Sequence, residues 1–192
     1  TEQGIWKAFV DRSDDDGKTW NKSQEVEISQ LEYKSGERTV GKDDSSIPVS
    51  EQSFYGRGVI QPTLWESIPD QVHMLLRSTE GMIYRSDSKD GGNTWTEAYA
   101  TELPNNNSGI DMIRSEDGKL FLVYNPVGVN WGDRTPISLA VSKDDGKTWE
   151  KIRDLSTGEG EFAYPAIIQD EDFLYITYTY KRKNIAFWKI RK

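Results

Sequence analysis

Apolar and polar residues alternate with a period of two along much of this chain. The alternation is clear in residues 120–125 and 137–142, where successive side chains would point to opposite faces of an extended strand. No segment of the sequence shows the apolar stripe of an amphipathic helix. The pattern therefore predicts an all-β protein.

Short strand candidates follow one another at close spacing, and polar breaks separate them. Residues 31–56 have weak periodicity and predict a long loop with a marginal hairpin around Lys34-Ser35-Gly36; loops of this length are usually functional or mobile. The predicted strands are residues 4–10, 25–28, 59–66, 71–78, 81–88, 97–103, 110–115, 119–125, 136–142, 151–155, 163–169, 173–180 and 184–190.

One eight-residue phrase, Ser-x-Asp-x-Gly-x-Thr-Trp, occurs three times, and we call it the repeat. Ser and Asp side chains bond backbone N–H groups nearby, Gly supplies a positive φ, and Thr and Trp return the chain to a strand. We expect each copy to be a turn anchored by its Trp, with its carboxylate held inside the turn. An EF-hand calcium loop is excluded by the ligand spacing, and we expect no metal. The repeat residues are Ser13, Asp15, Gly17, Thr19 and Trp20; Ser88, Asp90, Gly92, Thr94 and Trp95; and Ser142, Asp144, Gly146, Thr148 and Trp149.

The unit is strand–strand–strand–repeat–strand, and the first unit lacks its first two strands. Four-stranded units that recur along a sequence are the signature of β-propeller blades. We expect a single partial propeller domain over residues 1–192, with the end of one blade (1–30), the long loop (31–56), two blades (57–105 and 106–157) and a last blade (158–192) without its fourth strand. An open ring leaves the packing surfaces of its end blades uncovered. We therefore expect the missing half of the propeller, or a second copy of the chain, as a partner.

Charge and composition exclude several classes of function. The net charge is −8, which argues against nucleic acid or an anionic membrane as partner. No apolar run is long enough to span a bilayer, and without cysteine there is no thiol chemistry. We expect no cofactor.

The repeat resembles the Asp-box, or bacterial neuraminidase repeat, of the sialidase superfamily. Further stretches are similar to predicted bacterial exo-sialidases: GRGVIQPTLW at 56–65, LLRSTEG at 75–81, Tyr124-Asn125-Pro126 through Arg134-Thr135-Pro136, and Glu161 to Pro165. The resemblance covers essentially the whole chain. It implies the C-terminal half of a six-bladed propeller, a carbohydrate substrate, and a periplasmic or extracellular location.

In sialidases, three arginines bind the sugar carboxylate and a tyrosine attacks the anomeric carbon. The resemblance assigns Arg77 and Arg134 to two of the arginines and Tyr164 to the nucleophile. Planar guanidinium groups suit a carboxylate, and a phenol avoids the repulsion that a carboxylate nucleophile would meet there. The first arginine and the acid/base aspartate would lie in the missing half, so we expect this chain alone to be inactive.

The chain also departs from the family. Arg57 aligns where many sialidases carry the glutamate that activates the tyrosine, so Arg57 is a candidate substrate-binding cation, and Glu51 and Glu161 are candidate bases. The late glutamate that supports the first arginine is replaced near Tyr178-Thr179. Other candidates for substrate hydrogen bonds, each with a structural alternative, are Gln61, Asn107, Ser108, Asp111 and Asn125, whereas His73 is expected to be uninvolved.

Three functions remain open. The first is retaining hydrolysis of a terminal acidic sugar such as sialic acid. The second is a carbohydrate-binding or interaction propeller without catalysis. The third is a glycosidase or lyase that acts on another sugar.

Overall fold

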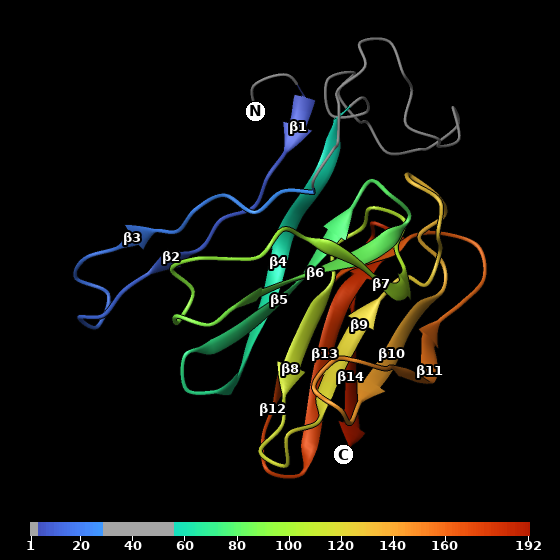
Figure 1. Ribbon diagram of the computed structural model, residues 1–192. Helices are drawn as coiled ribbons and strands as arrows, with labels where there is room; N and C mark the ends of the chain where they lie inside the picture. Colours follow the sequence, from blue (N-terminus) through green and yellow to red (C-terminus); the bar gives the residue numbers. More distant parts are fainter. Residues whose placement is uncertain (1–3, 29–55) are drawn as a thin grey trace.

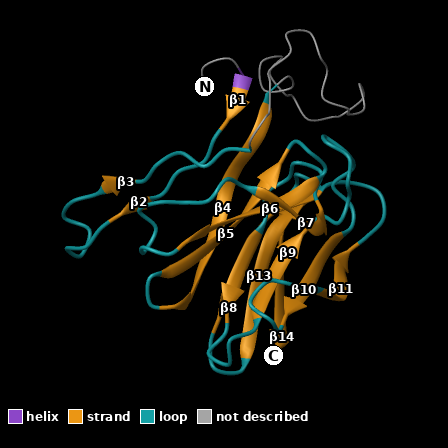
Figure 2. Cartoon of the chain, viewed as in Figure 1, coloured by secondary structure: helices purple, strands orange, loops and turns teal. Residues whose placement is uncertain are grey.

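The computed structural model describes residues 4–28 and 56–192. Apart from one helical residue, Gly4, the regular elements of these residues are strands (Figure 2). None of these residues belongs to a helix that is long and apolar enough to cross a bilayer. The strands are β1 (Ile5–Trp6), β2 (Asp11–Arg12), β3 (Asn21–Lys22), β4 (Arg57–Ile68), β5 (Gln71–Ser78), β6 (Met82–Ser88), β7 (Tyr99–Pro104), β8 (Asp111–Arg114), β9 (Leu120–Tyr124), β10 (Ile137–Ser142), β11 (Glu150–Ser156), β12 (Phe162–Gln169), β13 (Phe173–Tyr180) and β14 (Asn184–Arg191).

Consecutive strands pair antiparallel and form three main sheets. The orders are β4-β5-β6-β7, β8-β9-β10-β11 and β12-β13-β14, with β1 added in parallel to the edge strand β4 and a small β2-β3 pair beside them (Figure 1). The strands from residue 57 onward match the predicted ones within about two residues, because a period of two is a local signal. Except for Gly56, the predicted loop at 31–56, with its hairpin, lies outside the described residues.

The sheets pack face to face through apolar side chains. One cluster joins Trp65 and Leu75 of the first sheet to Leu120 and Leu122 of the second. A second cluster joins β9 and β10 to the third sheet, through residues such as Ile176. The core therefore lies between neighbouring sheets, which is how propeller blades bury their faces.

The N-terminal segment differs from its prediction. Residues 4–10 and 25–28 were expected to form two strands, but within these ranges the structure has only the short β1 and an isolated bridge between Ala8 and Val26. Ala8 and Val26 are both buried and pack with Val59 and Met74 of the first sheet. The segment follows the surface of that sheet, so tertiary packing overrides its strand propensity.

The three copies of the repeat form the same turn, and the prediction that the aspartates are held inside it is confirmed. One oxygen of each carboxylate accepts hydrogen bonds from the Ser hydroxyl and the Thr N–H, and the other accepts one from the Thr hydroxyl. The Ser oxygen accepts the Gly N–H. Bonds from the Thr hydroxyl and Thr N–H lower the pKa of Asp90 and of Asp144 to about 2. These carboxylates are structural.

The anchoring tryptophans are not equivalent. Trp95 is 5 % exposed and its indole N–H donates to the carbonyl of Gly92, as the prediction requires. Trp20 is 62 % exposed, although it makes the matching bond to Gly17. The expectation that Trp20 pins its turn to a hydrophobic layer is therefore wrong, because the described N-terminal residues supply only the two-residue strands β2 and β3 around it.

Candidate active site

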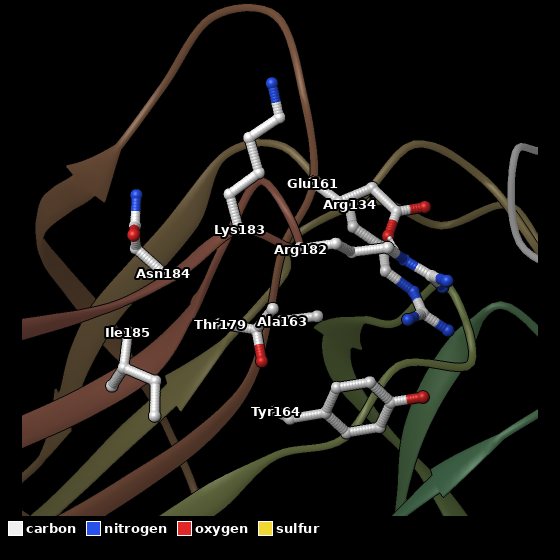
Figure 3. Close-up of a pocket in the computed structure, with 9 residues that line it drawn as sticks. All are labelled: Arg134, Glu161, Ala163, Tyr164, Thr179, Arg182, Lys183, Asn184 and Ile185. Carbon is white, nitrogen blue, oxygen red and sulfur yellow. Dashed lines mark hydrogen bonds and ion pairs between the residues drawn. The ribbon is translucent and has the colours of Figure 1, made fainter.

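Arg77, Arg134 and Tyr164, far apart in the sequence, lie together at one end of the sheets. Arg77 is near the end of β5, Arg134 lies in the loop before β10, and Tyr164 lies near the start of β12. The guanidinium carbon of Arg134 is 5.1 Å from the centre of the Tyr164 ring, and the hydroxyl of Tyr164 points to the side of the pocket that holds Arg134 (Figure 3). The structure thus brings together the three residues that the resemblance selected.

A break in the strand pairing presents Tyr164. The register of β12 against β13 shifts between Ala163 and Ala166, around Pro165, which has no N–H for the ladder. Tyr164 has a φ of 53°, a conformation that costs a non-glycine residue about 1–3 kcal/mol. Gln61, which precedes Pro62 at the equivalent break in β4, has a φ of 52°. Strained residues of this kind concentrate at functional sites.

Arg77 is 6 % exposed and bonds to neutral groups. Its Nε donates to Asn107 Oδ1 at 3.0 Å, and its Nη1 donates to Gln61 Oε1 at 2.7 Å. Burial, with a smaller effect of the like charge on Arg134, lowers the pKa of Arg77 to about 10, while Tyr164 acts in the opposite direction. Arg77 is therefore a cation at neutral pH, and no carboxylate of residues 4–28 or 56–192 forms an ion pair with it.

Arg134 is 4 % exposed, and its Nη1 has no hydrogen-bond partner among the described residues. Taking such an ion out of water costs several kcal/mol unless a counter-ion compensates it. Arg77 and Arg134 are two buried cations that converge on one phenol, and no carboxylate of the described residues forms an ion pair with either of them. The arrangement is suited to an anionic ligand.

Tyr164 is half exposed and carries a perturbed hydroxyl. Burial raises the pKa of this phenol, but the positive charges of Arg134, Arg77 and Arg182, with a hydrogen bond to Arg134, outweigh burial and lower the pKa below its ordinary value. A larger phenolate fraction makes the oxygen a better nucleophile.

An open pocket of about 730 Å³ adjoins Tyr164 (Figure 3). Glu161 is the one carboxylate among its described lining residues. Glu161 Oε2 lies 2.5 Å from Arg182 Nε, so the predicted candidate base is engaged in an ion pair. Glu51, the other candidate, lies outside the described residues. The pocket is lined by Arg134, Glu161, Ala163, Tyr164, Thr179, Arg182, Lys183, Asn184 and Ile185.

Several other candidates bond to protein groups. Arg57 forms an ion pair with Glu80 at 2.7 Å. Asn125 donates both amide hydrogens to the carbonyls of Pro136 and Phe162, and it accepts the Ser108 hydroxyl. These bonds leave no amide hydrogen of Asn125 for a substrate.

Asp111 and His73 also serve the scaffold. Asp111 accepts hydrogen bonds from Thr63, Met112 and Ile167, in β4, β8 and β12. His73 bonds to Asp87 at 2.5 Å and is buried in the first sheet. Within the described residues, no group of three His, Cys, Asp or Glu side chains could hold a metal ion.

Sequence reasoning did not single out Arg182. This residue lies in the turn between β13 and β14, and no motif marks it. The consecutive charges of Lys181-Arg182-Lys183 were the only signal, and a charge run of that kind is usually a solvated surface.

Comparisons with known proteins agree with this architecture. The family described as BNR repeat-like domain matches residues 1–176. NanB sialidase from Streptococcus pneumoniae superposes with a TM-score of 0.61 at 16% identity, and Trypanosoma rangeli sialidase with 0.61 at 14%, each over 95% of this chain. The GH93 α-L-arabinofuranosidase of Fusarium graminearum superposes with 0.54 at 17% identity over 70% of the chain. No curated protein matches.

The chain covers 26% of each sialidase and 45% of the arabinofuranosidase, so it spans less than half of these structures. At such identities the likeness establishes the fold. The predicted all-β, partial propeller architecture is confirmed.

Proposed function

Because the chain belongs to the BNR repeat-like domain family, whose fold it shares with glycoside hydrolases, we propose that its site binds a terminal acidic sugar such as sialic acid and serves retaining hydrolysis. The observation that carries the proposal is the pair of buried guanidinium groups, Arg77 and Arg134, beside Tyr164 without a described carboxylate partner. The repeats are then the Asp-boxes of the sialidase superfamily, and the partner is a glycan or glycoconjugate.

Each residue has a distinct part in the proposed reaction. Arg77 and Arg134 bind the sugar carboxylate through charge-assisted hydrogen bonds, which fixes the ring against Tyr164. The phenolate oxygen of Tyr164 forms a bond to the anomeric carbon while the bond from that carbon to the leaving oxygen breaks, and a general acid protonates the leaving oxygen. Water then hydrolyses the glycosyl-enzyme intermediate, which retains the configuration.

The arginines also activate the nucleophile. A phenol that ionises more readily needs less help from a general base. Such a phenol suits this site, because Arg57 occupies the position that aligns with the activating glutamate of many sialidases, and Glu161 is paired with Arg182. The proton of the phenol leaves to solvent before attack.

A second candidate is hydrolysis of a neutral sugar. The likeness to the α-L-arabinofuranosidase, whose structure is a complex with arabinobiose, supports it. A neutral sugar would leave two buried cations without a counter-ion, so the geometry favours an acidic ligand. Binding without catalysis is the third possibility, and turnover distinguishes it.

Calorimetry tests the choice of ligand. We expect this chain to bind N-acetylneuraminic acid or a uronic acid, and to bind L-arabinose at least ~10-fold more weakly, because only an anion compensates the two arginines. Arg134→Lys removes the planar guanidinium with its paired N–H donors and should weaken binding of the acid by about 10–100-fold. The exposed Arg153→Lys is the matched control and should leave affinity unchanged. Equal affinity for acid and arabinose would refute the acidic-sugar assignment.

Turnover tests the nucleophile. In the full natural chain, Tyr164→Phe should reduce release of an aryl leaving group from the acidic glycoside by at least ~10³-fold while the ligand still binds, because the phenyl ring keeps its packing against Arg134. Unchanged turnover in the variant would remove Tyr164 from the mechanism.

A further inference from the structure

The turn between β13 and β14 places Arg182 at the pocket in a defined conformation. Lys181 and Arg182 have φ values of 52° and 53°, and the N–H of Lys183 donates to the carbonyl of Tyr180 at 3.0 Å. Two central residues with positive φ are the mark of a type I′ hairpin turn. The N–H of Lys181 also donates to the carbonyl of Glu161 at 2.7 Å. The turn is thereby tied to the residue that precedes β12.

Glu161, whose carbonyl binds the turn, also holds the guanidinium of Arg182 through its carboxylate. Its Oε2 lies 2.5 Å from Arg182 Nε, and its side chain is 19% exposed. In Figure 3, Arg182 runs from the turn toward Arg134 and Glu161, on the side of the pocket to which the Tyr164 hydroxyl points. The ion pair is therefore part of the pocket wall next to the phenol, with the Arg182 side chain 40% exposed to solvent.

We propose that Glu161 and Arg182 form a positioning pair for Tyr164. The turn brings a third cation, Arg182, to the phenol, and Glu161 both orients that cation and reduces its electrostatic effect on the phenol. This inference deepens the proposed function and rests on it. Arg182 favours the phenolate by charge, and the proton passes to solvent when the phenol ionises. Glu161 acts in the opposite direction because its carboxylate partly neutralises Arg182.

The charged groups that face Tyr164 come from four elements. Arg77 extends from β5, Arg134 from the loop before β10, Arg182 from the β13–β14 turn, and Glu161 from the residue before β12. Lys183 of the same turn lines the pocket, but its side chain points away from Tyr164 (Figure 3). Arg77 and Arg134 face the position proposed for the substrate carboxylate, which will screen them once it binds. Arg182 is engaged by Glu161 instead, so its effect on the phenol persists in the complex.

A purely structural pair would only hold the turn in place, whereas a positioning pair would also shift the pKa of Tyr164. An ultraviolet titration distinguishes the two roles. The absorbance change of phenolate formation, minus that of the Tyr164→Phe protein, reports the pKa of Tyr164. We expect Arg182→Gln to raise that pKa by about 0.5–1 unit, from the loss of one nearby partly screened charge. Arg182→Lys keeps the charge and should restore most of the shift.

Glu161→Gln gives the opposite sign. It removes the neutralising charge, so the pKa of Tyr164 should fall. The matched control is Arg191→Gln at the exposed end of β14, which should not move the phenol. The inference is overturned if Arg182→Gln leaves the pKa unchanged, or if Glu161→Gln raises it as Arg182→Gln does, because both variants would then act by loosening the turn.

The proposed function and this inference fail in different ways. An intact Arg182-dependent shift in a chain that binds no acidic sugar would refute the proposed function. Acidic-sugar binding without that shift would refute the positioning pair. In the full natural chain, the pH at which kcat/KM rises should move with the phenol pKa in both variants.

Discussion

Asp111 offers the sharpest test of how the sheets hold the site. Its Oδ1 accepts hydrogen bonds from the Thr63 hydroxyl (3.1 Å) and the Met112 N–H (2.9 Å), and its Oδ2 accepts one from the Ile167 N–H (2.9 Å). One carboxylate therefore ties together β4, β8 and β12, the first strands of the three main sheets. Ile167 follows the break in β12 that presents Tyr164.

Asp111→Asn keeps the shape of the side chain and changes one bond. The amide oxygen can still accept from Thr63 and Met112, but the amide nitrogen then faces the N–H of Ile167. A hydrogen bond to a charged group contributes about 1.5–3 kcal/mol, and a buried N–H without a partner costs about 1–3 kcal/mol. Allowing for partial relaxation, we expect the free energy of unfolding to fall by about 2–4 kcal/mol.

Urea unfolding, followed by tryptophan fluorescence, measures this loss. The slope against urea should not change, because the surface exposed on unfolding is the same, whereas the midpoint should fall. The melting temperature should drop by about 4–16 °C, at about 2–4 °C for each kcal/mol in a chain of this size. Asp172→Asn, in the exposed turn before β13, is the matched control. A loss below about 0.5 kcal/mol, or an equal loss in the control, would show that Asp111 does not join the sheets.

Two further predictions concern the repeats. Gly146 has a φ of +76°, and an added Cβ would lie 3.1 Å from the ring of Trp65, whereas Gly158, with a φ of +90°, has open space around it. Both Gly→Ala changes carry a backbone cost of about 1–2 kcal/mol, so the extra loss at Gly146 in urea unfolding reports the contact of the added Cβ with Trp65 and Arg85, and equal losses would contradict that contact. Acidification is the second test. The carboxylates of Asp90 and Asp144 have a pKa of about 2, below the ordinary value of 3.8, so the stability they supply is complete above the ordinary value and is lost as the pH falls through about 2. An Asp90→Asn protein should lose less stability over that window, and an identical acid titration would refute the assignment.

Local features of the chain were well predicted where one local signal dominates. The expected strands at 71–78 and 173–180 coincide with β5 and β13, and the repeats form the expected turns. The residue before each repeat glycine also has positive φ, as at Asp16 and Asp145, which the glycine pattern alone did not indicate. The prediction was only partly confirmed at residues 4–10, where the structure keeps the short strand β1 and the bridge at Ala8, and packing on the first sheet decides the rest of the conformation.

The candidate site was predictable only in part. Arg77, Arg134 and Tyr164 were selected by resemblance, and the structure brings them together. The structure also shows Asn125 to be fully hydrogen-bonded to protein groups and Arg57 to be paired with Glu80. A list of polar residues near strand ends cannot distinguish a side chain that bonds inward from one that is left without a partner.

The sequence by itself determined the strands from residue 57 onward and the repeat turns, because a period of two and the Ser, Asp, Gly and Thr of each repeat act within a few residues of chain. Only the tertiary structure decided which charges meet at Tyr164 and which are neutralised elsewhere. Arg77, Arg134 and Arg182 reach the phenol from three separate sheets or their loops, and Glu161 restrains one of them. Contacts of that kind depend on how neighbouring sheets pack and where their strands break, which no local pattern contains.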